Sequence, residues 1–218
     1  MLLSVVVITL NEAANIGRCI ASVQGLADEV IVLDSGSTDE TCALARAAGA
    51  HVHTQPWLGY AAQKNHANRL AAAPFILSLD ADEAVSTELH ARLSALKKSG
   101  LKGAYRFNRA TNYCGTWVKH GGWYPDSKVR LFPKEAGRWE GDHVHETLEL
   151  VPGTPVTRVE GDLLHWSISS LADHRERIIR YSALQARKLH AKGKRPTWLK
   201  RWLSPPVRFI QGYVFRGP

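Results

Sequence analysis

Residues 2–12, LLSVVVITLNE, combine a run of apolar, mostly β-branched side chains with a polar end. Such a run is typical of a strand buried on both faces of a parallel sheet, and a helix capped by Asn11 is expected over residues 12–24. The run lacks a preceding basic segment, ends at Glu12 and has about half the length of a membrane-spanning helix. It is therefore predicted to be a strand over residues 2–10, not a signal peptide or an anchor.

Strands and helices continue to alternate through the first hundred residues. Strands are expected over 29–34, 50–53 and 75–80, and helices over 41–48, 59–72 and from about residue 86. This alternation predicts a parallel, Rossmann-like α/β layer. Beyond residue 100, aromatic and Gly-rich stretches predict short mixed strands and long loops.

The C-terminal part of the chain is predicted to be helical over residues 170–192. Its apolar side chains are expected to be buried and its basic ones to face outward; the apolar ones are Leu171, Ile178, Ile179, Leu184 and Leu189. Pro205 and Pro206 are expected to interrupt the structure that follows.

The chain has 218 residues with 28 Lys and Arg, 20 Asp and Glu, and a net charge of +8. Residues 1–174 have a net charge of −3 and residues 175–218 one of +11, so the excess belongs to the tail. This distribution excludes a uniformly basic nucleic-acid-binding domain, and no nucleic-acid partner is expected. Three cysteines without metal-site spacing indicate reduced thiols in a cytoplasmic protein.

Three carboxylates follow the predicted strand 75–80 in the sequence LSLDADE, residues 77–83. In open α/β sheets, ligands bind at the carboxyl ends of the strands, so Asp80, Asp82 and Glu83 are expected to face such a site. Asp80 and Asp82 lie on one side of an extended chain and are close enough to share a hard divalent cation. The alternative is that this acidic stretch only caps the helix near Ser86.

Two other strand ends carry polar groups at the same level. Asp34 precedes the turn SGSTD at residues 35–39, and Thr9 and Glu12 end the first strand. A turn with helix-capping residues accounts for 35–39 but leaves Asp34 unexplained. Convergence of three strand ends on one site therefore favours ligand binding over independent caps.

Four segments in this order and spacing resemble the family 2 inverting glycosyltransferases, which have the GT-A fold: SVVVITLNEAANI (4–16), EVIVLDSGSTDET (29–41), GYAAQKNHA (59–67) and LSLDADE (77–83). Within this family, YPDSKVRLFPK (124–134), RWEGDHVHETL (138–148) and the segment from residue 163 to 186 resemble bacterial lipopolysaccharide inner-core glycosyltransferases. The resemblance implies an α/β GT-A fold: a Rossmann-like half with a mixed central sheet, followed by C-terminal helices. It divides the chain into a nucleotide-sugar-binding half (1–100), an acceptor-binding half (101–168) and a basic, aromatic helical tail (169–218).

The resemblance also implies roles for individual residues toward a UDP-sugar donor. It places Thr9 and Glu12 at the nucleotide, Asp34 at the uracil, Lys64 and Asn65 near the donor, and Asp80 at the ribose or metal. Asp82 is expected to bind Mg²⁺ or Mn²⁺, which bridges the diphosphate and stabilises the leaving group. His165 either binds this ion or the diphosphate of the donor, or is a histidine of the core. Arg130 either binds donor phosphate or forms a structural ion pair.

Inverting transfer requires a general base that takes the proton of the acceptor hydroxyl. The sequence WEGDHVHETLE offers Asp142 and Glu146, and the resemblance favours Glu146, with Asp142 second. His143 and His145 lack the H-E-x-x-H spacing of a zinc site, so zinc is not expected.

The tail interleaves Trp198, Trp202 and other aromatic residues with basic side chains. This pattern predicts binding to an anionic membrane surface, the alternative being a packed terminal helix with a solvated basic face. We therefore expect a hexosyltransferase, using UDP-glucose, that acts on heptose of the lipopolysaccharide inner core. It is expected to be cytoplasmic and peripheral on the inner face of the cytoplasmic membrane, with a lipid-linked acceptor.

The alternatives are transfer to polyprenyl phosphate or another envelope glycan, and a non-catalytic module that binds nucleotide sugar or RNA. The last would explain the basic tail but not the strand-end acids. The natural chain is expected to continue beyond Pro218.

Overall fold

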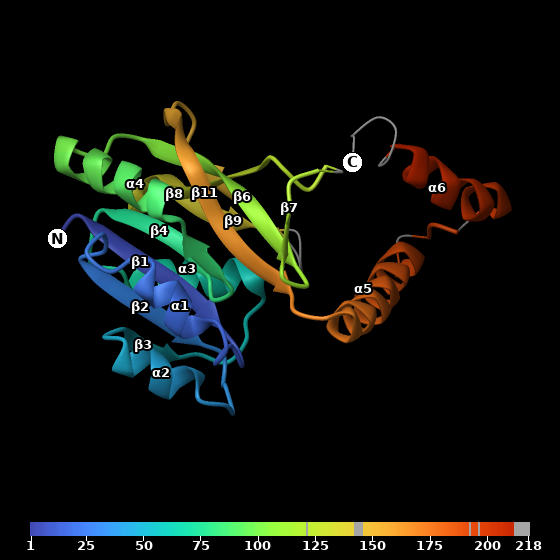
Figure 1. Cartoon of the computed structure of the whole chain (residues 1–218), viewed down its shortest axis with the longest axis horizontal. Helices are drawn as coiled ribbons and strands as arrows, with labels where there is room; N and C mark the ends of the chain where they lie inside the picture. The colour runs from blue at the N-terminus through green and yellow to red at the C-terminus, as the bar shows by residue number, and fades with distance from the viewer. Residues whose placement is uncertain (121, 142–145, 192, 196, 212–218) are drawn as a thin grey trace. The chain divides into compact units, whose positions relative to one another are not determined.

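The computed structural model describes residues 1–120, 122–141, 146–191, 193–195 and 197–211. Within these residues, nine strands form one sheet of order β3-β2-β1-β4-β8-β6-β11-β5, in which β7 pairs with β6, and two form a separate β9–β10 pair (Figure 1). The strands are β1 (Leu3–Thr9), β2 (Glu29–Asp34), β3 (His51–Thr54), β4 (Phe75–Asp80), β5 (Glu83–Val85), β6 (Ala104–Tyr113), β7 (Thr116–Val118), β8 (Asp126–Pro133), β9 (Gly137–Glu140), β10 (Thr147–Leu150) and β11 (Val156–Ile168). The helices are α1 (Ile16–Ala21), α2 (Thr41–Ala47), α3 (Tyr60–Leu70), α4 (Thr87–Ser99), the short 3₁₀ helix η1 (Lys134–Ala136), α5 (Leu171–Ala191) and α6 (Trp198–Ile210).

The parallel layer predicted for the first hundred residues is confirmed. β1 pairs in parallel with β2 and β4, and β2 pairs in parallel with β3. Alternate side chains of β1 enter two separate cores, so Val5 and Val7 pack with α1 and α4 residues, while Val6 and Ile8 pack with residues of α3. Figure 1 shows α1 and α4 on the near side of the sheet. Burial on both faces explains why this run contains no alternating polar residues.

The first helix differs from its prediction. α1 comprises Ile16–Ala21, shorter than the expected 12–24, and begins after Asn15. Asn11 does not cap it, because Asn11 adopts φ 55° and its Oδ1 accepts a hydrogen bond from Thr38 N at 2.9 Å. The side chain expected to start a helix therefore joins two loops instead.

The acidic stretch after β4 is not a helix cap. Ser86 is the N-cap of α4, and its hydroxyl accepts from Leu89 N at 3.2 Å. Glu83 instead begins the short strand β5, which pairs antiparallel with β11 and sets His165 opposite Glu83. The capping alternative for residues 80–83 is thus wrong, because a hydroxyl nearer the helix already performs that role.

The second half of the chain adds antiparallel strands to the parallel layer, as the mixed pattern predicted. β8 pairs antiparallel with β4, which places Leu131 beside Leu77. The chain separates into two compact units, one of residues 1–109 and 127–165, the other of residues 110–126 and 166–218. All described residues of the predicted donor, metal and catalytic site belong to the first unit.

Helix α5 matches its predicted bounds closely, but the predicted burial of its apolar face is wrong. Leu171, Ile178, Ile179 and Leu189 are all exposed, the first by 71%. The side chain of Leu184 lies outside the described set.

Helix α6 also departs from the prediction, since it continues through Pro205 and Pro206 to Ile210. In the part of the chain that the structure describes, no helix is both long and apolar enough to cross a bilayer.

Replacing Gly161 with alanine is expected to lower the free energy of unfolding by about 3 kcal/mol. Gly161 has φ +98°, and an added Cβ would lie 2.6 Å from Leu89 N and 2.7 Å from Leu89 Cα, which are backbone atoms of the buried start of α4. Gly153 provides the matched control, because it has φ +87° with open space around its Cα, so its alanine variant should cost about 1 kcal/mol. Urea unfolding followed by circular dichroism measures both losses, and equal losses would contradict the close packing.

Candidate active site

The ends of β1, β2 and β4 lie at one edge of the sheet, as the sequence predicted. Thr9 is the register partner of Asp34, and Ile8 is that of Asp80. Thr9 and Asp34 are buried, and no described residue forms a hydrogen bond with Thr9 Oγ1. Because buried polar atoms normally have a partner, this hydroxyl suits a polar ligand at the strand ends.

Asp34 organises the turn that follows β2. Its Oδ2 accepts hydrogen bonds from Gly36 N and Ser37 N, both at 2.9 Å. Burial alone would raise the pKa of Asp34, but the hydrogen bonds from Ser37 and Gly36 outweigh it and lower the pKa below its ordinary value. Asp34 is therefore an ionised acceptor, held in place by its own turn.

The loop after β1 is tied to the turn after β2. Asn11 N donates to Ser37 Oγ at 2.8 Å, and Glu12 N donates to Thr41 Oγ1 at 2.8 Å. The Glu12 carboxylate in turn accepts from Asn15 Nδ2 at 2.7 Å. These bonds order the backbone between two strand ends, at the edge where ligands bind in open α/β sheets.

Asp80 lies between two cations from distant parts of the chain. Its Oδ1 is 2.9 Å from Lys64 Nζ on α3, and its Oδ2 is 2.9 Å from Arg130 Nη2 on β8. Burial would raise the pKa of Asp80, but Lys64 and Arg130 hold it well below the ordinary value. Because both carboxylate oxygens are paired with cations, Asp80 is poorly placed to be the principal ligand of a metal.

Lys64 joins Asp80 to the predicted general base. Its Nζ is 3.0 Å from Glu146 Oε1 and lies 4.5 Å from the ring centroid of Trp139. Lys64 is almost fully buried, and Glu146 is 17% exposed. Asn65, the next residue of α3, exchanges two hydrogen bonds with the backbone of Trp139, at 2.7 and 2.9 Å. α3 thus links the strand ends to the segment that carries Glu146, the predicted base.

Glu83 adds a second carboxylate next to Asp80. Glu83 is buried, accepts from Asp80 N at 3.0 Å, and lies 2.8 Å from Arg130 Nη2. Burial raises the pKa of Glu83, and the neighbouring Asp80 adds to this effect, while Arg130 opposes it. The guanidinium of Arg130 therefore has two acidic partners in this structure, as its structural alternative predicted.

Asp82 points to a different partner from Asp80. Its Oδ2 is 3.3 Å from His165 Nε2, and the two side chains are 20% and 14% exposed. His165 Nδ1 is buried and has no hydrogen-bond partner among the described residues. The Asp82 carboxylate fits either Mg²⁺ or Mn²⁺, and the imidazole of His165 suits a transition metal such as Mn²⁺ better than Mg²⁺; the remaining ligands would come from water and phosphate.

The described residues contain no cluster of three or more His, Cys, Asp or Glu side chains arranged to hold a metal ion. Asp142, the second choice for the base, and the His143 and His145 pair lie outside the described residues.

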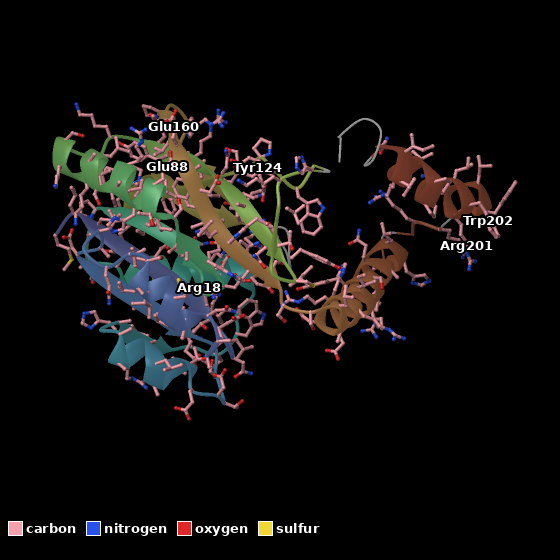
Figure 2. All side chains as sticks on the ribbon, in the orientation of Figure 1. Arg18, Glu88, Tyr124, Glu160, Arg201 and Trp202 are labelled. Carbon is pink, nitrogen blue, oxygen red and sulfur yellow. The ribbon has the colours of Figure 1, made fainter. Side chains whose placement is uncertain are left out.

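Several residues of this site were not assigned a role from the sequence. Trp139 packs against Lys64, and Glu83 and Arg109 complete the ion network, their closest atoms being 3.5 Å apart. Arg18, labelled in Figure 2, lies on α1, where burial lowers its pKa and the charges of Asp82 and Glu12 oppose that shift. Of these residues, only Glu83 was indicated by the sequence, where it is the third acidic residue of the stretch LSLDADE.

Replacing Lys64 with methionine is expected to lower the free energy of unfolding by about 3 kcal/mol. The change removes a buried cation, so the partly buried carboxylates of Asp80 and Glu146 lose the charge that pairs with them. The matched control is Arg92→Met, since Arg92 pairs with Glu160 at 2.9 Å but both side chains are more than half exposed. This control should cost less than about 1 kcal/mol. Urea unfolding measures the difference, and similar losses for the two variants would refute the importance of the buried pair.

A parallel sheet with acids at its strand ends, an Asp–His pair beside them and an antiparallel second half is the arrangement expected of a GT-A glycosyltransferase. The chain belongs to the family described as glycosyl transferase family 2, whose profile matches residues 4–147. The chain is also 32% identical over 228 aligned positions to the lipopolysaccharide core biosynthesis glycosyltransferase LpsC of Rhizobium meliloti, covering 99% of this chain and 82% of LpsC. The expected family is thereby confirmed.

Two further comparisons cover different parts of the chain. An uncharacterized glycosyltransferase of Rickettsia felis is 53% identical over 87 residues, which is 40% of this chain and 31% of that protein. The chain thus spans about a third of the length of this relative. The crystal structure of S. aureus TarS 1-349 in complex with UDP-GlcNAc superposes with a TM-score of 0.54 and 15% identity, covering 80% of this chain and 61% of that one. This likeness supports the fold.

Proposed function

We propose that the protein is a metal-dependent, inverting glycosyltransferase that moves glucose from UDP-glucose onto a heptose of the lipopolysaccharide inner core. The observation that carries the proposal is that Asp34, Asp80 and the Asp82–His165 pair belong to one compact unit, in which Lys64 bridges Asp80 and Glu146. Similarity to LpsC over nearly the whole chain supports a lipopolysaccharide core acceptor.

The donor half of the site binds and orients the nucleotide. The ionised Asp34 accepts a hydrogen bond from the base, and the buried Thr9 hydroxyl, which lacks a described partner, contacts the nucleotide beside it. Glu12 orders the loop after β1, and Asn65 fastens α3 to Trp139, so both shape the donor site. Asp80, fixed by Lys64 and Arg130, presents its partly exposed carboxylate to the ribose.

Asp82 and His165 would hold Mg²⁺ or Mn²⁺ at the diphosphate. A divalent cation bound there neutralises the negative charge that develops on the departing UDP. Arg130 keeps the Asp80–Glu83 segment in position, since its Nη2 contacts both carboxylates. The backbone that carries Asp82 is therefore ordered.

Glu146 takes the proton of the acceptor hydroxyl as that oxygen attacks the anomeric carbon. Lys64 orients Glu146, because its ammonium group is 3.0 Å from the carboxylate. A carboxylate that is 17% exposed is sufficiently accessible to reach an acceptor and sufficiently enclosed to be held in place.

The acceptor is lipid-linked, and the enzyme is cytoplasmic and peripheral on the inner face of the cytoplasmic membrane. The net charge of +11 over residues 175–218 supports this position, because anionic lipids attract basic segments.

A release assay tests the proposal. The full chain is incubated with UDP-glucose, UDP-galactose, UDP-GlcNAc or GDP-mannose, with lipid A core acceptors that end in heptose, and the released nucleoside diphosphate is measured. We expect release to need UDP-glucose, the heptose acceptor and a divalent cation. If release requires polyprenyl phosphate and not the heptose acceptor, polyprenyl phosphate is the acceptor. If the chain binds UDP-sugar but turns over no combination of donor and acceptor, it is a non-catalytic module.

A further inference from the structure

Helix α6 exposes an unusually large apolar face for a helix in a folded chain. Its apolar side chains are between 47% and 75% exposed: Trp198, Leu199, Trp202, Leu203, Val207, Phe209 and Ile210. Exposed patches of this kind mark interaction surfaces. The packed-helix alternative for the tail therefore has no support among the described residues.

The helix separates apolar and basic side chains clearly. At α-helical spacing, the apolar residues and the two prolines cover an arc of about 200°, and Lys200, Arg201 and Arg208 lie in the remaining arc with Ser204. Figure 2 labels Arg201 and Trp202, which are consecutive residues on opposite sides of this division. The chain has no Asp or Glu after Glu176, so nothing acidic balances the basic side.

We infer that α6 is an interfacial helix that lies in the plane of an anionic lipid bilayer, with Trp198, Trp202 and Phe209 inserted among the acyl chains. Its three basic side chains then reach lipid phosphates at the headgroup level. The importance of this contact for catalysis rests on the proposed function, because it brings the active site to a lipid-borne acceptor. The lipid binding itself does not depend on that function.

The proline pair restricts how deeply α6 can enter the bilayer. Proline has no N–H, so the carbonyls of Arg201 and Trp202 lack their usual donors at positions 205 and 206. Such carbonyls need water or headgroups, which the hydrocarbon core does not provide. The 13 residues of α6 also span only about 20 Å, less than the thickness of that core. Both features fit a helix at the interface.

Charge argues against a second copy as the occupant of this face. Residues 175–218 have a net charge of +11, so pairing two tails would bring like charges together. An anionic bilayer offers the complementary charge and an apolar layer in one partner.

Vesicle flotation of the full chain tests this inference. Vesicles of phosphatidylcholine alone are compared with vesicles that also contain phosphatidylglycerol, at low and high salt. The unmodified chain should float with the anionic vesicles and lose most of that binding at high salt. The double variant Lys200→Gln/Arg201→Gln should weaken the partition coefficient about 30-fold at low salt, and Trp198→Ala/Trp202→Ala at least about tenfold.

The matched controls come from the first unit. Trp57→Ala removes a tryptophan that is 47% exposed, and Arg92→Gln removes an exposed basic side chain, so both should float like the unmodified chain. Equal losses in controls and α6 variants, or no flotation of the unmodified chain, would overturn the inference. A dimer that light scattering detects and that Trp198→Ala/Trp202→Ala dissociates, without vesicle binding, would instead assign the face to a second copy.

The same α6 variants should retain transfer to a delipidated core oligosaccharide. Loss of flotation with retained transfer separates this inference from the proposed function, and flotation without transfer would refute only the latter.

Discussion

Replacing Asp82 with asparagine is expected to lower the rate of sugar transfer about 10³-fold while the protein remains folded. Asparagine retains the size of the side chain but loses the charge that a divalent cation needs, and it replaces one oxygen of the carboxylate that lies 3.3 Å from His165 Nε2. Steady-state release of UDP measures the rate. A thermal shift on adding Mn²⁺, present in the unmodified chain and absent in the variant, gives a second measurement that does not require turnover.

Glu160→Gln is the matched control for this carboxylate-to-amide change. Glu160 also lies on β11 with His165, but its side chain is 76% exposed and its partner Arg92 is on the surface. The control should retain full transfer and the Mn²⁺ shift. Unchanged metal-dependent turnover in Asp82→Asn would show that the assigned role of Asp82 is wrong.

Replacing Glu146 with glutamine is expected to lower transfer between about 10² and 10⁴-fold, because the amide cannot take the proton of the acceptor hydroxyl. UDP-glucose binding should change little, since Glu146 contacts Lys64 and not the strand-end acids directly. Isothermal titration with UDP-glucose and a transfer assay under saturating donor separate the two effects.

Two further variants test the assignment of the base. Glu149→Gln changes an exposed carboxylate on β10, three residues along, and should have no effect. Asp142→Asn should retain transfer within about tenfold of the unmodified chain. Full transfer in Glu146→Gln together with its loss in Asp142→Asn would exchange the roles of the two acids.

The sequence predicted the parallel half of the fold well because each strand there is buried on both faces. Short continuous apolar runs such as Leu3–Thr9 are typical of strands that are buried on both faces, and polar residues mark the ends of these strands. The helix boundaries were harder to predict. Asn11 is a residue type that often caps helices, but its positive φ and its hydrogen bond from Thr38 N depend on a loop 27 residues away.

The C-terminal helices show a second limit of sequence analysis. Apolar spacing in α5 predicted a buried face, yet spacing alone does not say what covers a face, and Leu171 and Ile179 are exposed. Pro205 and Pro206 predicted an interruption, whereas α6 contains both.

In the site, the sequence predicted which strand ends converge but not how the charges pair. Asp80 and Asp82 were expected to share one cation because they lie two residues apart. Instead, Asp80 is paired with Lys64 and Arg130, while Asp82 faces His165. These partners lie 16 to 83 residues away in the chain, and only the folded sheet brings them to the strand end.

The most direct test of inverting glucosyl transfer is the anomeric configuration of the product made from UDP-glucose and a heptose-terminated core oligosaccharide. The glucose of UDP-glucose is α-linked, so direct attack with Glu146 as the base predicts a β-linked product, which proton NMR identifies from the coupling of the anomeric proton. An α-linked glucose on the same acceptor, or no transfer with any divalent cation, would contradict the account.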